Sequence, residues 1–491
     1  YRSAMTATGI PRPIAATRLS GGSRQTGESM DGLYALKVRE IAGAAFRQPP
    51  SFWLVCLYLV LEYVRPQAIY PWLDVLPWAQ VVLIAAPIAL LIEGKSLVPR
   101  SPLTWALGLF SVAVVASIPG AHDPSLGWDK FSIYLTWVLA YLLIASAAAT
   151  EKRFFLFLFL FLLASFKMGQ HGVQSFVAGG GGYSDWGATG APGWFHNSGE
   201  FGIQMCIFFP MSLYFIAALR ERWGKGKLFL LASFPASAVI SIVVSSSRGA
   251  LVGLAAVGLW MLLRSRHRVR GAVGLALLAA TVWLVLPAEQ KTRLSTMGDD
   301  GTSQNRLTYW ADGVRTIREY PITGVVYENW QSYYRSTGRG SGLLHNIFLQ
   351  AGAELGLFGL GSLLVLVGTS FVVTARVRKR AERIGPRAKF AALTARGLDG
   401  AMIGFLVSGS FVTVLFYPYL WFAIGMTAAL ERMVSEIQPE GPGATGLPGQ
   451  PELRDARWRP GVVQVAARVA GNPSRVVSSR RNGRGGIVGM G

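Results

Sequence analysis

A single arginine stands in a long apolar stretch, and its type and place suggest a functional site. Residues 228–263 contain one charged residue, Arg248, within the sequence Ser-Ser-Ser-Arg-Gly at 245–249. Serine and glycine favour a tight turn, so we expect two short helices with Arg248 at their outer mouth. The alternative is an arginine that extends to lipid headgroups, but the cost of a mouth-lining charge favours a functional role.

His345 is the main candidate for a proton acceptor. It follows a segment that contains Gly338, Gly340 and Gly342, and it begins a long apolar stretch that we expect to be a helix. The positive end of a helix dipole disfavours imidazolium, so the sequence predicts a neutral imidazole that can take a proton. The alternative is an ordinary histidine at the membrane–water boundary.

The segments beside these two residues add further candidates. Glu354 lies deeper in the helix of His345 and is either a structural hydrogen-bond acceptor or the partner of a buried arginine. Arg306 begins an amphipathic helix that ends before Pro321 and includes Trp310. Aromatic rings of this region could stack on sugars or form an interfacial belt. These rings are Tyr309, Trp310, Tyr327, Trp330, Tyr333 and Tyr334.

Two polar clusters have structural explanations that compete with functional ones. His196 and Asn197 precede Ser198-Gly199-Glu200 at the start of another predicted helix, where an N-cap at Asn197 or Ser198 is favoured. Asp299 and Asp300 could bind a divalent metal, but an acid pair between glycines is more typical of a turn. The sequence contains no nucleotide-binding or zinc signature, so we expect neither a metal nor a cofactor.

The elements that position these residues are membrane helices. Apolar residues make up 51% of the chain and charged residues 15%, and the mean hydropathy is +0.38. The apolar residues form blocks that are hydrophobic all round, which excludes a cytosolic enzyme, a disulfide scaffold and a disordered protein. The blocks predict an all-α polytopic bundle of about twelve transmembrane helices. We expect helices near 51–65, 78–92, 102–118, 131–149, 154–170, 200–219, 228–246, 249–263, 271–287, 345–374, 398–416 and 418–432.

The net charge of +21 is explained by the placement of basic residues in alternate loops, which predicts a cytoplasmic N-terminus. We expect contact with membrane lipid and none with nucleic acid, since no basic stripe alternates with stacking aromatic residues. Two long segments should lie outside, at about 167–198 and 287–344, the second with its amphipathic helix on the membrane surface.

Three regions follow from this pattern. Residues 1–50 form an N-terminal extension that we expect to be disordered or non-native, with Met30 a plausible start. Residues 51–432 form the transmembrane domain, and residues 433–491 form a basic, disordered cytoplasmic tail. Cys56 and Cys206 lie in separate apolar runs without metal-ligand spacing.

The order of the motifs resembles the O-antigen ligase and O-antigen polymerase superfamily over roughly residues 50–432. The shared pattern is Ser247-Arg248-Gly249, then Arg306 and Trp310 in a long outer loop, then His345-Asn346-x-x-Leu349 and Glu354-x-Gly356-x-x-Gly359. The segment Glu62-Tyr63-Val64-Arg65-Pro66-Gln67 and the two tails lie outside it.

The resemblance implies glycosyl transfer at the outer face of a bacterial inner membrane, without a metal, from a glycan on undecaprenyl diphosphate. A diphosphate leaves without protonation, so the site needs arginines and a base rather than a carboxylic acid. We therefore assign catalysis to His345 and Arg248. We assign substrate binding to Arg306, Asn346, Trp310, Glu354, His196 and Asn197.

Several alternatives stay open at this point. The reaction could be ligation or polymerisation, and the acceptor could be lipid A core, another repeat unit or a protein. A metal-dependent glycosyltransferase would use Asp299 and Asp300. A transporter or flippase for lipid-linked glycans would instead show broken helices or repeated halves, with charges near the bilayer midplane.

Overall fold

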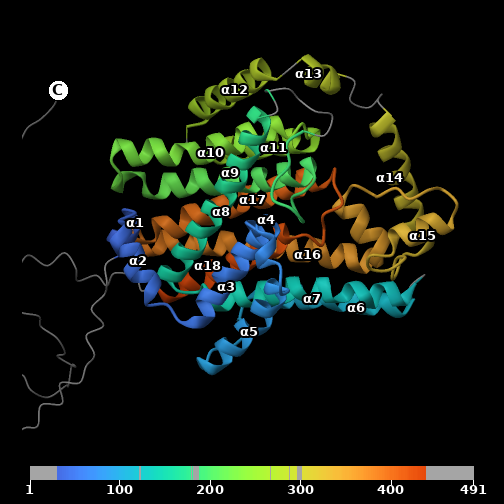
Figure 1. Ribbon diagram of the computed structural model, residues 1–491, viewed down its shortest axis with the longest axis horizontal. Coiled ribbons are helices and arrows are strands. Elements are labelled where there is room, and N and C mark those ends of the chain that lie inside the picture. The colour runs from blue at the N-terminus through green and yellow to red at the C-terminus, as the bar shows by residue number, and fades with distance from the viewer. Residues whose placement is uncertain are drawn as a thin grey trace, which may run out of the picture. The chain divides into compact units, whose positions relative to one another are not determined.

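The computed structural model describes residues 30–437 except 121–122, 179, 181–186, 266, 287 and 296–300, and within these ranges the regular structure is helical. The chain divides into a unit that ends at Pro439 and a second unit, Glu440–Gly491. The second unit lies outside the described residues, so the predicted cytoplasmic tail stays a prediction. Figure 1 shows the helices of the first unit.

Each apolar block that the sequence predicted as a helix is one, with bounds that shift by several residues. The helices are α1 (Asp31–Tyr34), α2 (Val38–Phe46), α3 (Pro50–Tyr63), α4 (Pro66–Ile69), α5 (Trp78–Ile92), α6 (Pro102–Ser117), α7 (Pro124–Ala147), α8 (Glu151–Ala178), α9 (Ser198–Leu219), α10 (Lys225–Val244), α11 (Arg248–Arg264), α12 (Arg268–Val285), α13 (Ala288–Ser295), α14 (Gly301–Glu319), α15 (Trp330–Ser336), α16 (Ile347–Ile384), α17 (Lys389–Gly409) and α18 (Pro418–Glu436). Short 3₁₀ turns are η1 (Pro71–Leu73), η2 (Ile118–Gly120), η3 (Arg220–Arg222) and η4 (Pro386–Ala388).

The helices fit a multi-pass membrane protein. Among the described residues, 6 helical segments are long and apolar enough to cross a membrane, and they contain α7, α8, α9, α10, α16 and α17. The helices α3, α5 and α6 are apolar but shorter. Large apolar side chains such as Trp105 (83% exposed) and Phe229 (84%) point outward, as they do where the solvent is lipid. The total of about twelve spans stays a prediction.

Helix α9 packs closely against α11 and α17 through small residues. A Cβ atom added to Gly202 of α9 would lie 2.6 Å from Cβ of Ala250 on α11. Added to Gly404 of α17, it would lie 2.8 Å from the carbonyl oxygen of Cys206 on α9. Small residues let helix backbones approach each other in this way in membrane proteins. The thiol of Cys206 also donates to the carbonyl oxygen of Ala250 over 3.1 Å.

Helix α16 is broken at Gly356, a feature that the predicted continuous helix 345–374 did not include. Gly356 has φ 69° and ψ −171°, a left-handed conformation that favours glycine. The backbone of residues 321–325 enters at the break, because Val325 N–H donates to Ala353 over 2.8 Å and Leu357 N–H donates to Pro321 over 2.8 Å. The segment after α14 is thereby fixed to the first turns of α16.

Residues 31–46, which the sequence grouped with an N-terminal extension, form α1 and α2 on the bundle. Tyr34 is buried, its hydroxyl donates to Glu151 over 2.6 Å, and its carbonyl oxygen accepts from Trp223 over 2.7 Å. Residues 1–29 lie outside the described ranges.

Helix α14 forms where the sequence predicted an amphipathic helix. It ends at Glu319, shortly before Pro321. One side of α14 packs on α16 and on the residues before α16. A Cβ atom added to Gly313 of α14 would lie 2.6 Å from Leu344, and one added to Gly352 of α16 would lie 2.6 Å from Ile317 of α14. The helix is therefore seated on protein along this side.

Candidate functional site

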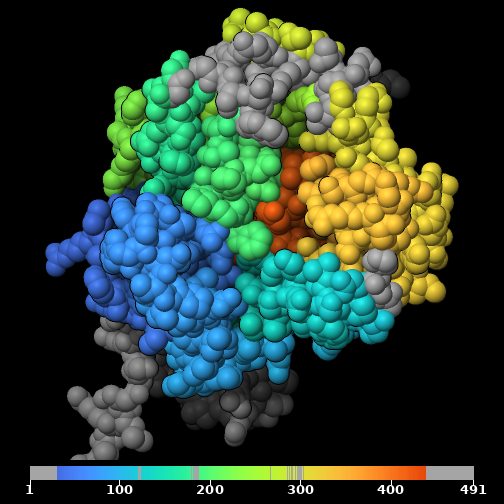
Figure 2. All heavy atoms as spheres, turned by 45° about the vertical axis from the view of Figure 1, so that its right-hand side comes forward, coloured from blue at the N-terminus to red at the C-terminus, as the bar shows by residue number. Residues whose placement is uncertain are grey.

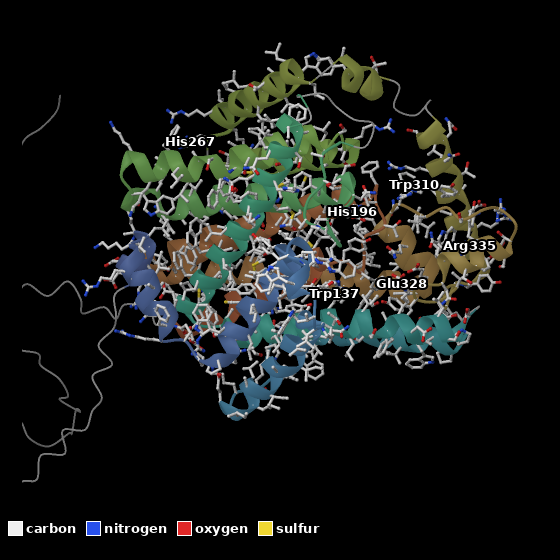
Figure 3. All side chains as sticks on the ribbon, in the orientation of Figure 1. Trp137, His196, His267, Trp310, Glu328 and Arg335 are labelled. Carbon is white, nitrogen blue, oxygen red and sulfur yellow. The ribbon has the colours of Figure 1, made fainter. Side chains whose placement is uncertain are left out.

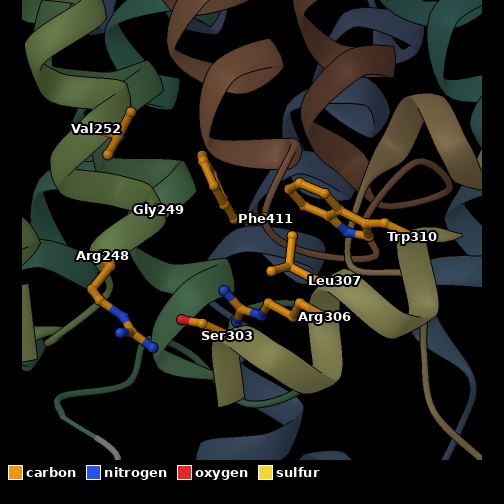
Figure 4. Close-up of a pocket in the computed structure, with 8 residues that line it drawn as sticks. All are labelled: Arg248, Gly249, Val252, Ser303, Arg306, Leu307, Trp310 and Phe411. Carbon is orange, nitrogen blue, oxygen red and sulfur yellow. The ribbon is translucent and has the colours of Figure 1, made fainter. Parts of the chain in front are cut away.

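A cavity of about 170 Å³ lies between α11 and α14, and we call it the arginine cavity. Arg248 and Arg306 line it, one from each helix. Figure 4 shows both guanidinium groups on the same side of the cavity, next to Ser303. The remaining lining residues are Gly249, Val252, Leu307, Trp310 and Phe411. The cavity thus combines two cations with an apolar wall.

A tight turn joins α10 and α11, as the sequence predicted, and it places Arg248 in the wall of the arginine cavity. Ser246 adopts φ 57°, and the hydroxyl of Ser247 caps α11 by accepting from Ala250 N–H over 3.3 Å. Arg248 is consequently the first residue of α11. The positive end of a helix dipole lies at this position and adds to the attraction for an anion.

The segment 187–197 supports this turn and contacts the motif at residues 62–67, which the sequence left unexplained. Ala188 N–H donates to Val244 at the end of α10 over 2.9 Å. At the other end of the segment, Arg65 donates to the carbonyl oxygen of Pro192 over 3.1 Å, and Trp194 donates to Glu62 over 2.8 Å. The end of α3 therefore holds the segment that rests on the α10–α11 turn.

His345 lies directly before α16 rather than in its first turn. Its backbone is left-handed, with φ 48°, and its N–H donates to the hydroxyl of Thr413 over 2.9 Å. The side-chain oxygen of Asn346 caps the helix by accepting from the N–H groups of Phe348 (2.9 Å) and Leu349 (3.1 Å). The oxygen of Asn346, predicted to bind substrate, thus serves the helix in this structure.

The imidazole of His345 is neutral at neutral pH. Burial lowers its pKa to about 4, and the positive charge of Arg306 acts in the same direction. The sequence predicted neutrality from a helix dipole, whereas the structure assigns it chiefly to burial. The influence of Arg306 also shows that the histidine lies within electrostatic reach of the arginine cavity.

The glycine-rich segment before His345 is held in place by two indoles. Trp310 donates to the carbonyl oxygen of Leu344 over 2.9 Å, and Trp330 donates to that of Gly342 over 2.9 Å. Trp330 and Tyr334 are 2% exposed and form a small core with Leu344. Trp330 and Tyr334 therefore stabilise the glycine-rich segment before His345, whereas Trp310 both anchors Leu344 and lines the arginine cavity.

A second cavity of about 150 Å³, which we call the acidic cavity, contains Glu328 and Glu354. Glu354 is 4% exposed and accepts from the amide of Gln350 over 3.3 Å, which agrees with the structural hydrogen-bond acceptor, one of the two roles that the sequence left open. Burial raises the pKa of Glu328, and Lys130 partly opposes this shift. The other lining residues are Trp330, Gln331, Leu343, Leu344, Gln350, Thr413, Phe416 and Tyr417.

Asn197 forms the predicted N-cap of α9. Its side chain accepts from Gly199 N–H over 2.9 Å, while Glu200 accepts from Asn197 N–H over 3.1 Å, which completes a capping box. His196 is exposed beside this cap. Figure 3 shows His196, Trp310 and Glu328 toward one end of the molecule and His267 toward the other.

The acid pair proposed for a metal, Asp299 and Asp300, lies outside the described residues. Within the residues that the structure describes, no group of three or more histidine, cysteine, aspartate or glutamate side chains could hold a metal ion. In the space-filling view, the residues from α14 to α16 (yellow to orange) lie together on one part of the surface (Figure 2).

The fold and the site define a multi-pass helical membrane protein with a cationic cavity next to a neutral histidine. Residues 228–364 match the family model of the O-antigen ligase, and residues 31–217 match a family of unknown function, DUF5935. The match of residues 228–364 supports the resemblance to the O-antigen ligase superfamily that the order of the motifs indicated over residues 50–432, and it supports a glycan-transfer function in the membrane. No curated protein matches the chain.

Proposed function

We propose that the protein transfers a glycan from undecaprenyl diphosphate to an acceptor hydroxyl at the outer face of the bacterial inner membrane. The carrying observation is the arginine cavity, where Arg248 and Arg306 meet beside a histidine that stays neutral. Those three residues all lie within the segment that matches the O-antigen ligase family. The proposal makes the chain an O-antigen ligase-like or polymerase-like glycosyltransferase.

The arginine cavity suits both parts of a polyprenyl diphosphate, the charged diphosphate and the apolar lipid. Guanidinium groups bind phosphate oxygens through charge-assisted hydrogen bonds, and their fixed charge stabilises the diphosphate as it leaves. The apolar wall formed by Val252, Leu307 and Phe411 fits the first carbons of the lipid. Donor binding and leaving-group stabilisation thus rest on the same two arginines.

His345 acts as the general base in this proposal. As the acceptor oxygen bonds to the anomeric carbon, the imidazole takes the hydroxyl proton, and the bond between that carbon and the diphosphate oxygen breaks. A pKa of about 4 makes the free histidine a weak base. A bound diphosphate would offset the positive charge of Arg306, the smaller of the two causes, so we expect donor binding to raise the pKa of His345.

The orientation follows from the distribution of charge. We infer about twelve spans with both termini inside, because Lys and Arg gather in alternate loops. Residues 287–344 then face outward, together with the cavity and His345. Asn346, Glu354, His196 and Asn197 stay candidates for substrate binding near this mouth.

One feature expected of a transporter is present, namely the broken helix α16. At the break, Ala353 accepts a backbone hydrogen bond from Val325 and Leu357 donates one to Pro321, so the break has a structural use in holding residues 321–325. The two cavity-lining arginines come from the first residue of α11 and from α14 rather than from the centre of a span. These observations favour the enzyme over the transporter.

The test is Arg248→Lys, which keeps the charge but removes the bidentate fork. Loss of one charged hydrogen bond corresponds to roughly a tenfold to hundredfold weaker interaction, so transfer should fall by about that factor while expression is unchanged. Arg264→Lys, at the exposed end of the same helix, is the matched control. Transfer by purified protein in proteoliposomes, with the producing strain's lipid-linked glycan as donor, is the measurement. Near-normal transfer by Arg248→Lys would return this residue to a headgroup-binding role.

A further inference from the structure

The arginine cavity and the acidic cavity lie on two sides of the residues around His345. Leu344 lines the acidic cavity, and its carbonyl oxygen accepts the hydrogen bond from Trp310, which lines the arginine cavity. Thr413 also lines the acidic cavity, and its hydroxyl accepts from His345 N–H. The proposed base is therefore tied by neighbouring atoms to both cavities.

The two cavities differ in charge. The arginine cavity contains two guanidinium groups among its lining residues, whereas the acidic cavity contains the carboxyl groups of Glu328 and Glu354 and the amide of Gln350. A diphosphate is attracted to the first and repelled by the second. A neutral, polyhydroxylated ring has the opposite preference, since its hydroxyl groups donate to carboxylate and amide oxygens and its apolar face packs on aromatic rings.

We propose that the acidic cavity is the acceptor subsite and holds the terminal, hydroxyl-bearing sugar that receives the glycan. This inference rests on the proposed function, because it names the second substrate of the same site. Glu328 and Glu354 accept hydrogen bonds from hydroxyl groups of that sugar, and Tyr417 and Phe416 contact its apolar face. The hydroxyl that reacts then reaches His345 from the side opposite the diphosphate.

The cavity is built to keep its polar groups fixed. Glu328 has φ 58° and is followed by Asn329, whose side-chain oxygen accepts from Asp123 N–H over 3.1 Å and whose amide donates to Tyr327 over 3.2 Å. The amide of Gln350 is fixed as well, since it donates to Glu354 and its oxygen accepts from Leu415 N–H over 3.3 Å. Fixed groups lose little conformational freedom when a ligand binds.

Burial raises the pKa of Glu328, which increases the protonated fraction of its carboxyl group near neutral pH. A carboxylic acid both donates and accepts hydrogen bonds, so this residue can match a sugar hydroxyl in either direction. The carboxyl groups of Glu328 and Glu354 therefore do not carry two full negative charges, and the cavity needs no metal or cationic ligand to compensate them.

The experiment compares one thiol in each cavity in the full-length protein in nanodiscs. Gln331→Cys places a thiol in the acidic cavity and Ser303→Cys places one in the arginine cavity. The two native cysteines are buried. Labelling with a maleimide is measured with two probes, undecaprenyl diphosphate and the delipidated oligosaccharide from the producing strain's envelope. We expect the oligosaccharide to protect the thiol at 331 and undecaprenyl diphosphate to protect the thiol at 303, each with little effect on the other.

Glu328→Gln in the Gln331→Cys background tests the carboxyl group itself. Loss of the hydrogen bonds of this carboxyl group should weaken protection by the oligosaccharide by about tenfold. Glu319→Gln, an exposed change on α14, is the matched control and should leave protection unaltered. A second double variant, Ser303→Cys with Glu328→Gln, reports on folding. If undecaprenyl diphosphate still protects the thiol at 303 in this variant, Glu328→Gln has not unfolded the protein.

The outcomes separate the two proposals. Protection at 303 by undecaprenyl diphosphate without protection at 331 by the oligosaccharide overturns the acceptor subsite and leaves the donor site standing. Oligosaccharide protection that Glu328→Gln does not weaken removes Glu328 from the subsite. Absence of protection at 303 contradicts the proposed function itself.

Discussion

Substitution of His345 separates chemistry from folding, because its backbone conformation has a cost that is independent of the imidazole. With φ 48°, the residue adopts a left-handed conformation that costs an L-amino acid about 1–2 kcal/mol, except glycine and to a lesser extent asparagine. The N–H group that donates to Thr413 belongs to the backbone and persists in every variant. Alanine, asparagine and glycine at this position therefore differ in strain but share the loss of a base.

The structure predicts a different order for stability and for rate. Transfer should fall by about a hundredfold to ten-thousandfold in all three variants, the usual scale for a positioned base. Stability should be lower for His345→Ala than for His345→Asn by roughly 0.5–1 kcal/mol, since asparagine tolerates the left-handed region. His345→Gly should be at least as stable as His345→Ala, although it buries fewer atoms.

The assay measures turnover, thermal unfolding and binding of undecaprenyl diphosphate for purified protein in the same nanodiscs. Donor affinity should be retained, because the arginines bind the diphosphate. A turnover that follows the order of stability across the three variants would show that His345 acts through structure. Full activity in both His345→Ala and His345→Asn would remove it from the mechanism.

Three further predictions follow from neighbouring features. Arg306→Gln removes a charge that lowers the pKa of His345, so the acid limb of the pH profile of kcat/KM for the donor, near pH 4 in the parent, should move to higher pH. Arg306→Lys should leave the limb in place, and an unmoved limb in Arg306→Gln would contradict the coupling between the two residues. Gly356→Ala places a methyl group 2.3 Å from a backbone oxygen and should destabilise the protein by about 1–3 kcal/mol in thermal unfolding, whereas Gly361→Ala meets open space and should be tolerated. Equal stability of the two variants would refute the role of the break. Trp310→Phe loses the hydrogen bond to the segment before His345 and should lower turnover about fivefold, with Trp105→Phe at an exposed position as control. Parental turnover in Trp310→Phe would contradict a role for this hydrogen bond.

The sequence predicted the helices because lipid requires long apolar blocks, and local chemistry predicted two of their ends. The serines before Arg248 indicated the tight turn, and Asn197 with Glu200 indicated the capping box, because both depend on neighbours in the chain. The break at Gly356 was not predictable in this way. A glycine pair in a membrane helix is equally typical of close helix packing, and the break depends on the distant residues 321–325.

The sequence indicated several residues of the proposed site but not their surroundings. Arg248 and His345 stood out because a charge and a histidine are rare between apolar blocks. Glu328 gave no local signal, since its importance comes from the cavity that it shares with Glu354. Trp310, which lines the arginine cavity, was assigned to substrate binding through the family resemblance, whereas no local signal showed that Trp330 is packed in a small core.

The close packing of α9 has a consequence for how such proteins can recombine. The two matched segments meet between residues 217 and 228, in the connection from α9 to α10, yet Gly202 and Cys206 of the first segment fit against Ala250 of the second. A chimera that exchanged residues 228–364 alone would set a foreign α11 against the resident α9, with no space for even one additional methyl group at Gly202. Exchange of specificity between such proteins therefore requires that α9 travel with the segment that carries Arg248 and His345.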